Sequence, residues 1–69
     1  MNENTNNWVK ISNYYEDTAW INLSRVARLT VGRGGGTNYY YIYADGEQLP
    51  VKFTSKFIAE DELKKIFAR

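Results

Sequence analysis

An Asp45-Gly46 pair stands between two runs, 39–43 and 47–53, that are rich in aromatic and β-branched residues. Asp-Gly suits a two-residue type I′ turn, whose central residues need positive φ, so this pattern predicts a β-hairpin. The register that such a turn imposes pairs Ala44 with Glu47, Ile42 with Leu49 and Tyr40 with Val51.

Side chains alternate between the two faces of a strand, so this hairpin is predicted to have two different faces. One face is an ordinary apolar core made of Tyr40, Ile42, Leu49, Val51 and Phe53. The other collects Tyr39, Tyr41 and Tyr43, opposite Gln48, Pro50 and Lys52.

A second hairpin is predicted nearer the N-terminus, from strands at 8–13 and 18–23 with a turn at 15–17. The expected pairs are Ile11 with Ile21 and Val9 with Leu23. Its aliphatic face consists of Val9, Ile11, Ala19, Ile21 and Leu23. Its other face carries Trp8, Tyr14 and Trp20, with Lys10, Ser12 and Asn22.

The rest of the chain predicts a corner at 22–25, a strand at 26–31 and a glycine-rich hairpin loop at 32–38. A helix follows, with Thr54 or Ser55 as its N-cap. Its apolar stripe is Ala59, Leu63, Ile66 and Phe67, extended by Phe57 or Ile58. Residues 1–7 are polar after Met1 and predict a disordered tail, and residues 8–69 predict a single domain.

The expected fold is α+β: a curved antiparallel sheet of about five strands, a half-barrel-like β-meander, with one C-terminal amphipathic helix on its aliphatic face. The 69 residues include neither cysteine nor histidine, so disulfides are excluded and a zinc site is not expected. Stability must come from packing, and a core this small supplies only about 3–5 kcal/mol.

One helix cannot cover both faces of such a sheet, so the aromatic face needs another explanation. There are three alternatives: the sheet curls and buries the rings, a second subunit covers the rings, or a ligand covers them. The sequence favours a small, non-enzymatic binding module that acts through protein–protein interaction, with itself or with another protein. The predicted interaction residues are Trp8, Tyr14, Trp20, Tyr39, Tyr41, Tyr43, Lys52, Arg28 and Arg33.

Binding of single-stranded nucleic acid is the alternative. Bases stack on exposed aromatic side chains of a sheet while basic residues follow the phosphates. The three tyrosines would form the platform, and the charge would come from Arg25, Arg28, Arg33, Lys10 and Lys52. The net charge of only +1 argues against this function.

Catalysis is not expected. With no histidine, Ser and Thr lack the usual general base, and no carboxylate occupies a position where burial would raise its pKa. The run Gly32–Thr37 lacks the Lys-Ser/Thr of a phosphate-binding loop, and no cofactor or metal is predicted. With neither a signal peptide nor a membrane span in evidence, a cytoplasmic location is expected.

The segment 20–67 contains the run Ile21-Asn22-Leu23-Ser24-Arg25-Val26, an Ala-Asp-Gly hairpin, Val51-Lys52-Phe53-Thr54-Ser55 and an amphipathic helix. This order resembles small flagellar-operon proteins of the FlbD type and is similar to the later half of LytTR DNA-binding domains. The glycine-rich loop and the run of tyrosines depart from both patterns, and no functional residue is carried over.

Overall fold

The computed structural model describes residues 7–67. It contains five strands and one α-helix in an α+β arrangement, as expected. The strands are β1 (Trp8–Ser12), β2 (Thr18–Asn22), β3 (Leu29–Arg33), β4 (Tyr40–Ala44) and β5 (Glu47–Phe53), and the helix is α2 (Lys56–Phe67). The tail predicted for 1–7 lies, except for Asn7, outside the described residues, as do the last two residues of the predicted domain.

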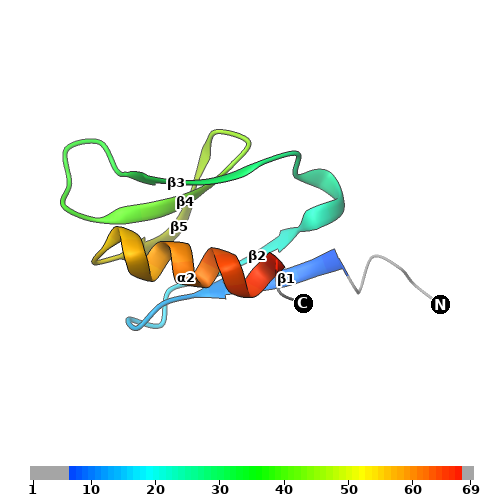
Figure 1. Ribbon diagram of the computed structural model, residues 1–69, viewed down its shortest axis with the longest axis horizontal. Helices are drawn as coiled ribbons and strands as arrows, with labels where there is room; N and C mark the ends of the chain where they lie inside the picture. Colours follow the sequence, from blue (N-terminus) through cyan, green and yellow to red (C-terminus); the bar gives the residue numbers. More distant parts are fainter. Residues whose placement is uncertain (1–6, 68–69) are drawn as a thin grey trace.

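The predicted single five-stranded sheet is wrong. The strands form two antiparallel sheets, a two-stranded sheet β1-β2 and a three-stranded sheet β3-β4-β5, and they do not curl into a half-barrel. In Figure 1, α2 runs alongside both sheets.

A 3₁₀ turn at Leu23–Arg25 follows β2 directly. The Asn22 side chain accepts a hydrogen bond from the Ser24 N–H at 3.0 Å. The chain therefore turns here, as predicted for residues 22–25.

The third strand begins three residues later than predicted. The Asp45 carboxylate accepts hydrogen bonds from the N–H groups of Ala27 (3.1 Å) and Arg28 (2.9 Å). The Asp45 N–H in turn donates to the Arg28 carbonyl at 2.9 Å. Because these groups are bonded to Asp45, the regular ladder with β4 starts only at Leu29 and extends to Arg33, inside the stretch predicted as loop.

The Asp45-Gly46 turn is confirmed. Asp45 has φ 53° and Gly46 has φ 85°, and Ala44 pairs with Glu47. Tyr43 pairs with Gln48, as this register requires, but Tyr41 pairs with Lys52. The predicted pair of Tyr40 with Val51 is therefore wrong, because Tyr40 pairs with Phe53, and the ladder is irregular at Ile42, which was predicted to pair with Leu49. β5 therefore holds two extra residues opposite Ile42. The irregularity contains Pro50, which has no N–H to give to a ladder.

The first hairpin shows the same kind of shift. The predicted pairs of Ile11 with Ile21 and Val9 with Leu23 are wrong, because Val9 pairs with Ile21 and Ile11 with Ala19. Both register errors amount to two residues. An even shift leaves every strand side chain on its face, so the predicted division into aliphatic and aromatic faces is retained within the strands. Tyr14, which was predicted on the aromatic face, lies in the turn beyond β1.

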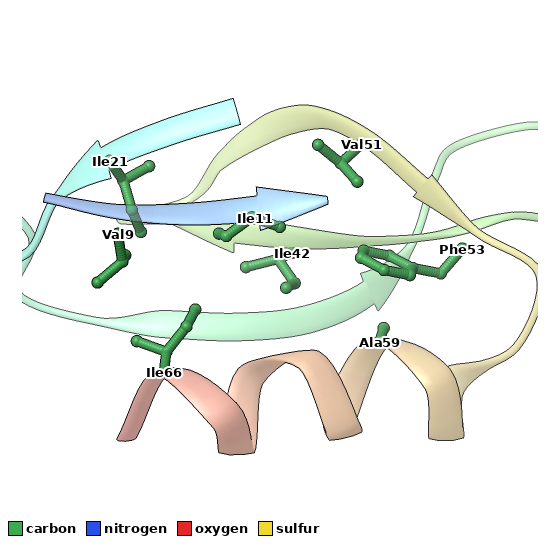
Figure 2. Packing of buried hydrophobic residues seen from close by; sticks show 8 residues of the cluster. All are labelled: Val9, Ile11, Ile21, Ile42, Val51, Phe53, Ala59 and Ile66. Atoms are coloured by element: carbon green, nitrogen blue, oxygen red, sulfur yellow. The ribbon is translucent and has the colours of Figure 1, made fainter. Parts of the chain in front are cut away.

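Both sheets and the helix contribute to one core. Figure 2 shows the buried side chains pointing toward one another: Val9, Ile11, Ile21, Ile42, Val51, Phe53, Ala59 and Ile66. Leu63 packs against this cluster, whereas Phe67, predicted to be part of the helix stripe, is exposed. Ser55 is the N-cap, because its Oγ accepts a hydrogen bond from the Ile58 N–H at 3.2 Å.

Candidate functional site

The aromatic residues singled out by the sequence are divided between the two sheets. Trp8 and Trp20 lie on the outer face of the β1–β2 sheet, and Lys10 pairs directly with Trp20. The side chains of the two tryptophans are 45% and 60% exposed. Since a tryptophan is highly buried on average, two of them exposed on one small face are unusual.

Tyr41 and Tyr43 lie on the outer face of the three-stranded sheet and are half-buried there. A Cβ atom placed on Gly34 would come within 2.6 Å of Tyr41 Cε1, so the Tyr41 ring fills the space above that glycine. The Tyr43 hydroxyl donates to Gln48 Oε1 at 3.1 Å, and it lies 3.4 Å from the Arg33 carbonyl oxygen. Both rings therefore pack within their own sheet.

Tyr39 belongs to a different group, centred on Lys52. The Lys52 Nζ lies 4.7 Å from the centre of the Tyr39 ring and 5.4 Å from that of Tyr15, within cation–π distance of both. Tyr14, which is 97% exposed, meets Tyr15 edge to face at 6.4 Å between ring centres. Lys52 thus joins the end of β5 to the turn of the first hairpin.

The outer face of the three-stranded sheet, which carries Tyr41 and Tyr43, is called here the tyrosine face. The two arginines of the predicted site do not lie on it. Arg33 pairs with Tyr40, which packs against the core, so alternation places Arg33 on the face opposite Tyr41. Arg28 precedes β3 and is exposed, with its backbone bonded to Asp45. Of the basic residues within β3, β4 and β5, only Lys52 shares the face of Tyr41 and Tyr43.

Tyr15 was missed as a site residue, because the sequence pattern placed it only in the turn. Its position depends on Asn13. The Asn13 Oδ1 accepts hydrogen bonds from the N–H groups of Tyr15 and Asp17, both at 2.9 Å. Its Nδ2 donates to Asp17 Oδ2 at 3.0 Å and also to the carbonyl oxygen of Lys52. One side chain thus shapes the turn and ties it to the other sheet. The signal available in the sequence was the pair of adjacent tyrosines, Tyr14 and Tyr15, at the predicted turn.

A pocket of ≈ 290 Å³ opens beside this group. Its walls come from the first turn, the end of β5 and the start of α2, with Tyr14, Tyr15, Lys52 and Ile58 among the lining residues. Phe53, only 2% exposed, also lines it and supplies an apolar surface continuous with the core. This volume is just below the ~300–1,000 Å³ of pockets that hold drug-sized ligands. It suits a single large side chain.

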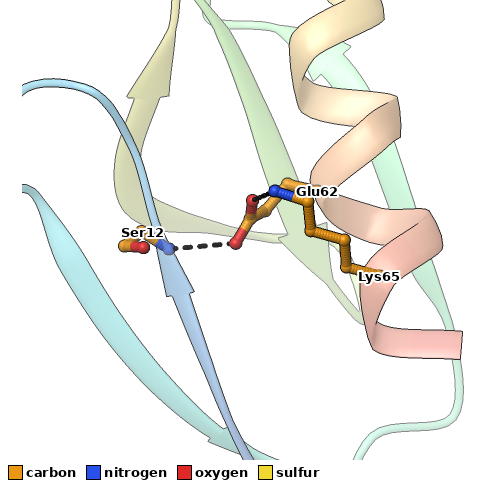
Figure 3. Close-up of polar contacts among 3 residues, drawn as sticks. All are labelled: Ser12, Glu62 and Lys65. Carbon is orange, nitrogen blue, oxygen red and sulfur yellow. Dashed lines mark hydrogen bonds and ion pairs between the residues drawn. The ribbon is translucent and has the colours of Figure 1, made fainter. Parts of the chain in front are cut away.

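A second hollow, of ≈ 320 Å³, lies between β1 and α2 and is lined in part by Trp8, Lys10 and Glu62. Figure 3 shows how Glu62 is held there. Its Oε2 accepts a hydrogen bond from the Ser12 N–H at 3.4 Å, and its Oε1 lies 3.5 Å from the Lys65 Nζ. Glu62 therefore connects the helix to β1, and its carboxylate is already paired.

The remaining polar groups offer no reactive cluster. Among residues 7–67, no group of three or more acidic side chains is arranged to hold a metal ion. Every buried side-chain nitrogen or oxygen in this part of the chain has a hydrogen-bond partner. No helix within the same range is long and apolar enough to cross a membrane.

Comparison with protein-family models, with curated proteins and with solved structures finds no match for this chain. The functional argument therefore depends on the geometry described above.

Proposed function

We propose that the chain is a non-enzymatic protein-interaction module that self-associates through the outer face of its β1–β2 sheet. The observation that carries this proposal is the exposure of Trp8 and Trp20 on that face. Tryptophan is among the residues most enriched at the centres of protein interfaces, where its large apolar surface is buried.

The size of the core favours a second copy as the partner. Among residues 7–67, the buried cluster consists of eight residues and contains a single aromatic side chain, Phe53. Both tryptophans remain outside it, and about half of their surface stays exposed and contributes little to folding. A two-fold dimer that places one β1–β2 face on another would bury four indole rings at once. Lys10 would cover the rings with its aliphatic stem while its ammonium group stays in water.

The tyrosines are less suited to this role than the sequence predicted. Tyr41 and Tyr43 already pack over the glycines of β3 and its loop, and Tyr43 uses its hydroxyl within the sheet. A partner would therefore gain less new apolar contact there than over the half-exposed indole rings.

The nucleic-acid alternative is disfavoured by the position of the charges. Phosphate recognition needs several cations beside the stacking platform. In the described strands of the tyrosine face, only Lys52 meets this need, and its ammonium group is already placed over two rings. Titration with single-stranded oligonucleotides at two salt concentrations tests this alternative. Tight binding with a steep salt dependence would support it over self-association.

Light scattering across a concentration series tests the proposal directly. The wild-type protein is expected to change from monomer to dimer as concentration rises. Because both tryptophans of the chain lie on this face, their fluorescence should shift to the blue over the same range. Trp20→Thr, which keeps a good strand former at an exposed position, should weaken the dimer by at least about tenfold.

Phe57→Ser is the matched control, since Phe57 is an exposed aromatic residue on α2, outside the proposed interface. It should leave the dimer unchanged. A protein that stays monomeric, with unshifted fluorescence at the highest attainable concentration, would overturn self-association. A dimer insensitive to Trp20→Thr would place the interface elsewhere.

A further inference from the structure

The pocket beside Lys52 combines an apolar interior with a positive rim. Phe53, Tyr15 and Ile58 supply apolar surface, and Ile58 remains 50% exposed. Lys52 also lines the pocket, and among residues 7–67 no carboxylate lies within ion-pair distance of its Nζ. Two aromatic rings hold this ammonium group in place, but neither neutralises it.

The start of α2 adds to the positive potential at the same rim. Ile58 lies in the first turn of the helix, where the backbone N–H groups carry the positive end of the helix dipole. The first turn contains no acidic residue to offset it, and it begins with Lys56. Glu16 and Asp17, the acidic residues of the neighbouring turn, do not line the pocket.

The walls of the pocket are held by polar contacts before any ligand arrives. Asn13 fixes Tyr15 by its backbone and also bonds the carbonyl group of Lys52. Ser55 caps the turn that carries Ile58. A preformed pocket reduces the entropy that a ligand must lose on binding, so even a small apolar group gains affinity there.

We infer that this pocket docks a segment of another protein in which a large apolar side chain stands next to an aspartate or glutamate. The apolar side chain enters over Phe53, and the carboxylate meets Lys52 and the first turn of α2. This site goes beyond the proposed self-association, because no residue of the pocket lies on the outer face of the β1–β2 sheet.

The probe is a hexapeptide with capped ends. It contains an aspartate followed directly by a phenylalanine, and glycines and serines fill the other positions on both sides of this pair. Two matched peptides replace the aspartate with asparagine or the phenylalanine with alanine. Amide shifts of ¹⁵N-labelled protein should change saturably at 13–15, 52–54 and 58 with the first peptide. The asparagine peptide should bind about two- to fivefold more weakly, the range of a partly exposed ion pair. The alanine peptide should not bind.

Lys52→Met keeps the aliphatic stem and removes the charge. In this variant the aspartate and asparagine peptides should bind equally, while Lys64→Met, an exposed lysine on α2 away from the pocket, should keep the preference of the wild type. The amide spectrum of each variant shows directly whether it is folded.

Three results would overturn the inference. The first is absence of saturable shifts at these positions in the folded wild-type protein. The second is equal binding of the aspartate and asparagine peptides, which would remove the role of the charge. The third is a change of the same amides with protein concentration alone, which would make a second copy the occupant. Failure of the tryptophan dimer would leave these peptide titrations unaffected.

Discussion

The two hairpins of this protein close their turns by different means. In the β4–β5 hairpin, Asp45 and Gly46 form a two-residue turn through their backbone angles, which leaves the Asp45 side chain to hold residues 27 and 28. In the β1–β2 hairpin, the Asn13 side chain organises a longer turn and bonds the carbonyl of Lys52. The β4–β5 turn is local in origin, whereas the β1–β2 turn depends on a contact with the other sheet.

Loss of core volume should affect both hairpins together, because they share one core. Ile11 in β1 and Ile42 in β4 are both fully buried. Ile11→Ala and Ile42→Ala should each lower the free energy of unfolding by about 2–5 kcal/mol. Urea denaturation followed by circular dichroism measures this loss. If Ile11→Ala released only the first hairpin and left the second intact, the shared core would be contradicted.

Removal of the turn side chains should cost more in the first hairpin. Asn13→Ala deletes four hydrogen bonds and should lower the free energy of unfolding by about 1–3 kcal/mol. Asp45→Gly keeps a residue that tolerates positive φ and deletes only the bonds to residues 27 and 28, so about 1 kcal/mol is expected. Urea titrations of both variants compare them, and the reverse order would show that the Asp45 side chain is the more important link.

Both turns should be more stable with glycine at their positive-φ positions, so Gly46→Ala and Glu16→Gly should have opposite effects on stability. Gly46→Ala places a Cβ at φ 85° in open space, so only backbone strain is added, about 1–2 kcal/mol. Glu16 has φ 70° in the first turn, and Glu16→Gly should relieve such strain and raise the thermal midpoint slightly. Thermal unfolding checks both variants. A stabilising Gly46→Ala would contradict the described turn.

The smallest effect is expected where α2 holds the first hairpin. Glu62→Gln keeps an acceptor for the Ser12 N–H but removes the charge that faces Lys65. Because Lys65 is 77% exposed, this ion pair is screened by water, and the loss should stay below about 1 kcal/mol. Urea denaturation at low and high salt measures it. A larger loss at both salt concentrations would show that Glu62 is essential for docking the helix on β1.

Features that depend on neighbouring residues could be predicted from the sequence. Asp45-Gly46 forms the expected turn because positive φ is a local property of these two residue types. Ser55 caps the helix, and the aliphatic and aromatic faces separate as alternation requires. The candidate interaction residues were named from the same alternation, and their role in binding stays a prediction.

Features that depend on distant contacts were decided only by the tertiary structure. Alternation determines which face a side chain takes, but it is unchanged by a two-residue shift. The register of β1–β2, and that of β4–β5 beyond its irregularity, were therefore predicted wrongly while the faces of the strand residues were right. The start of β3 at Leu29 depends on Asp45 bonding residues 27 and 28, and the pocket depends on Asn13 reaching Lys52. These bonds join residues 17 to 39 positions apart, and no local pattern encodes them.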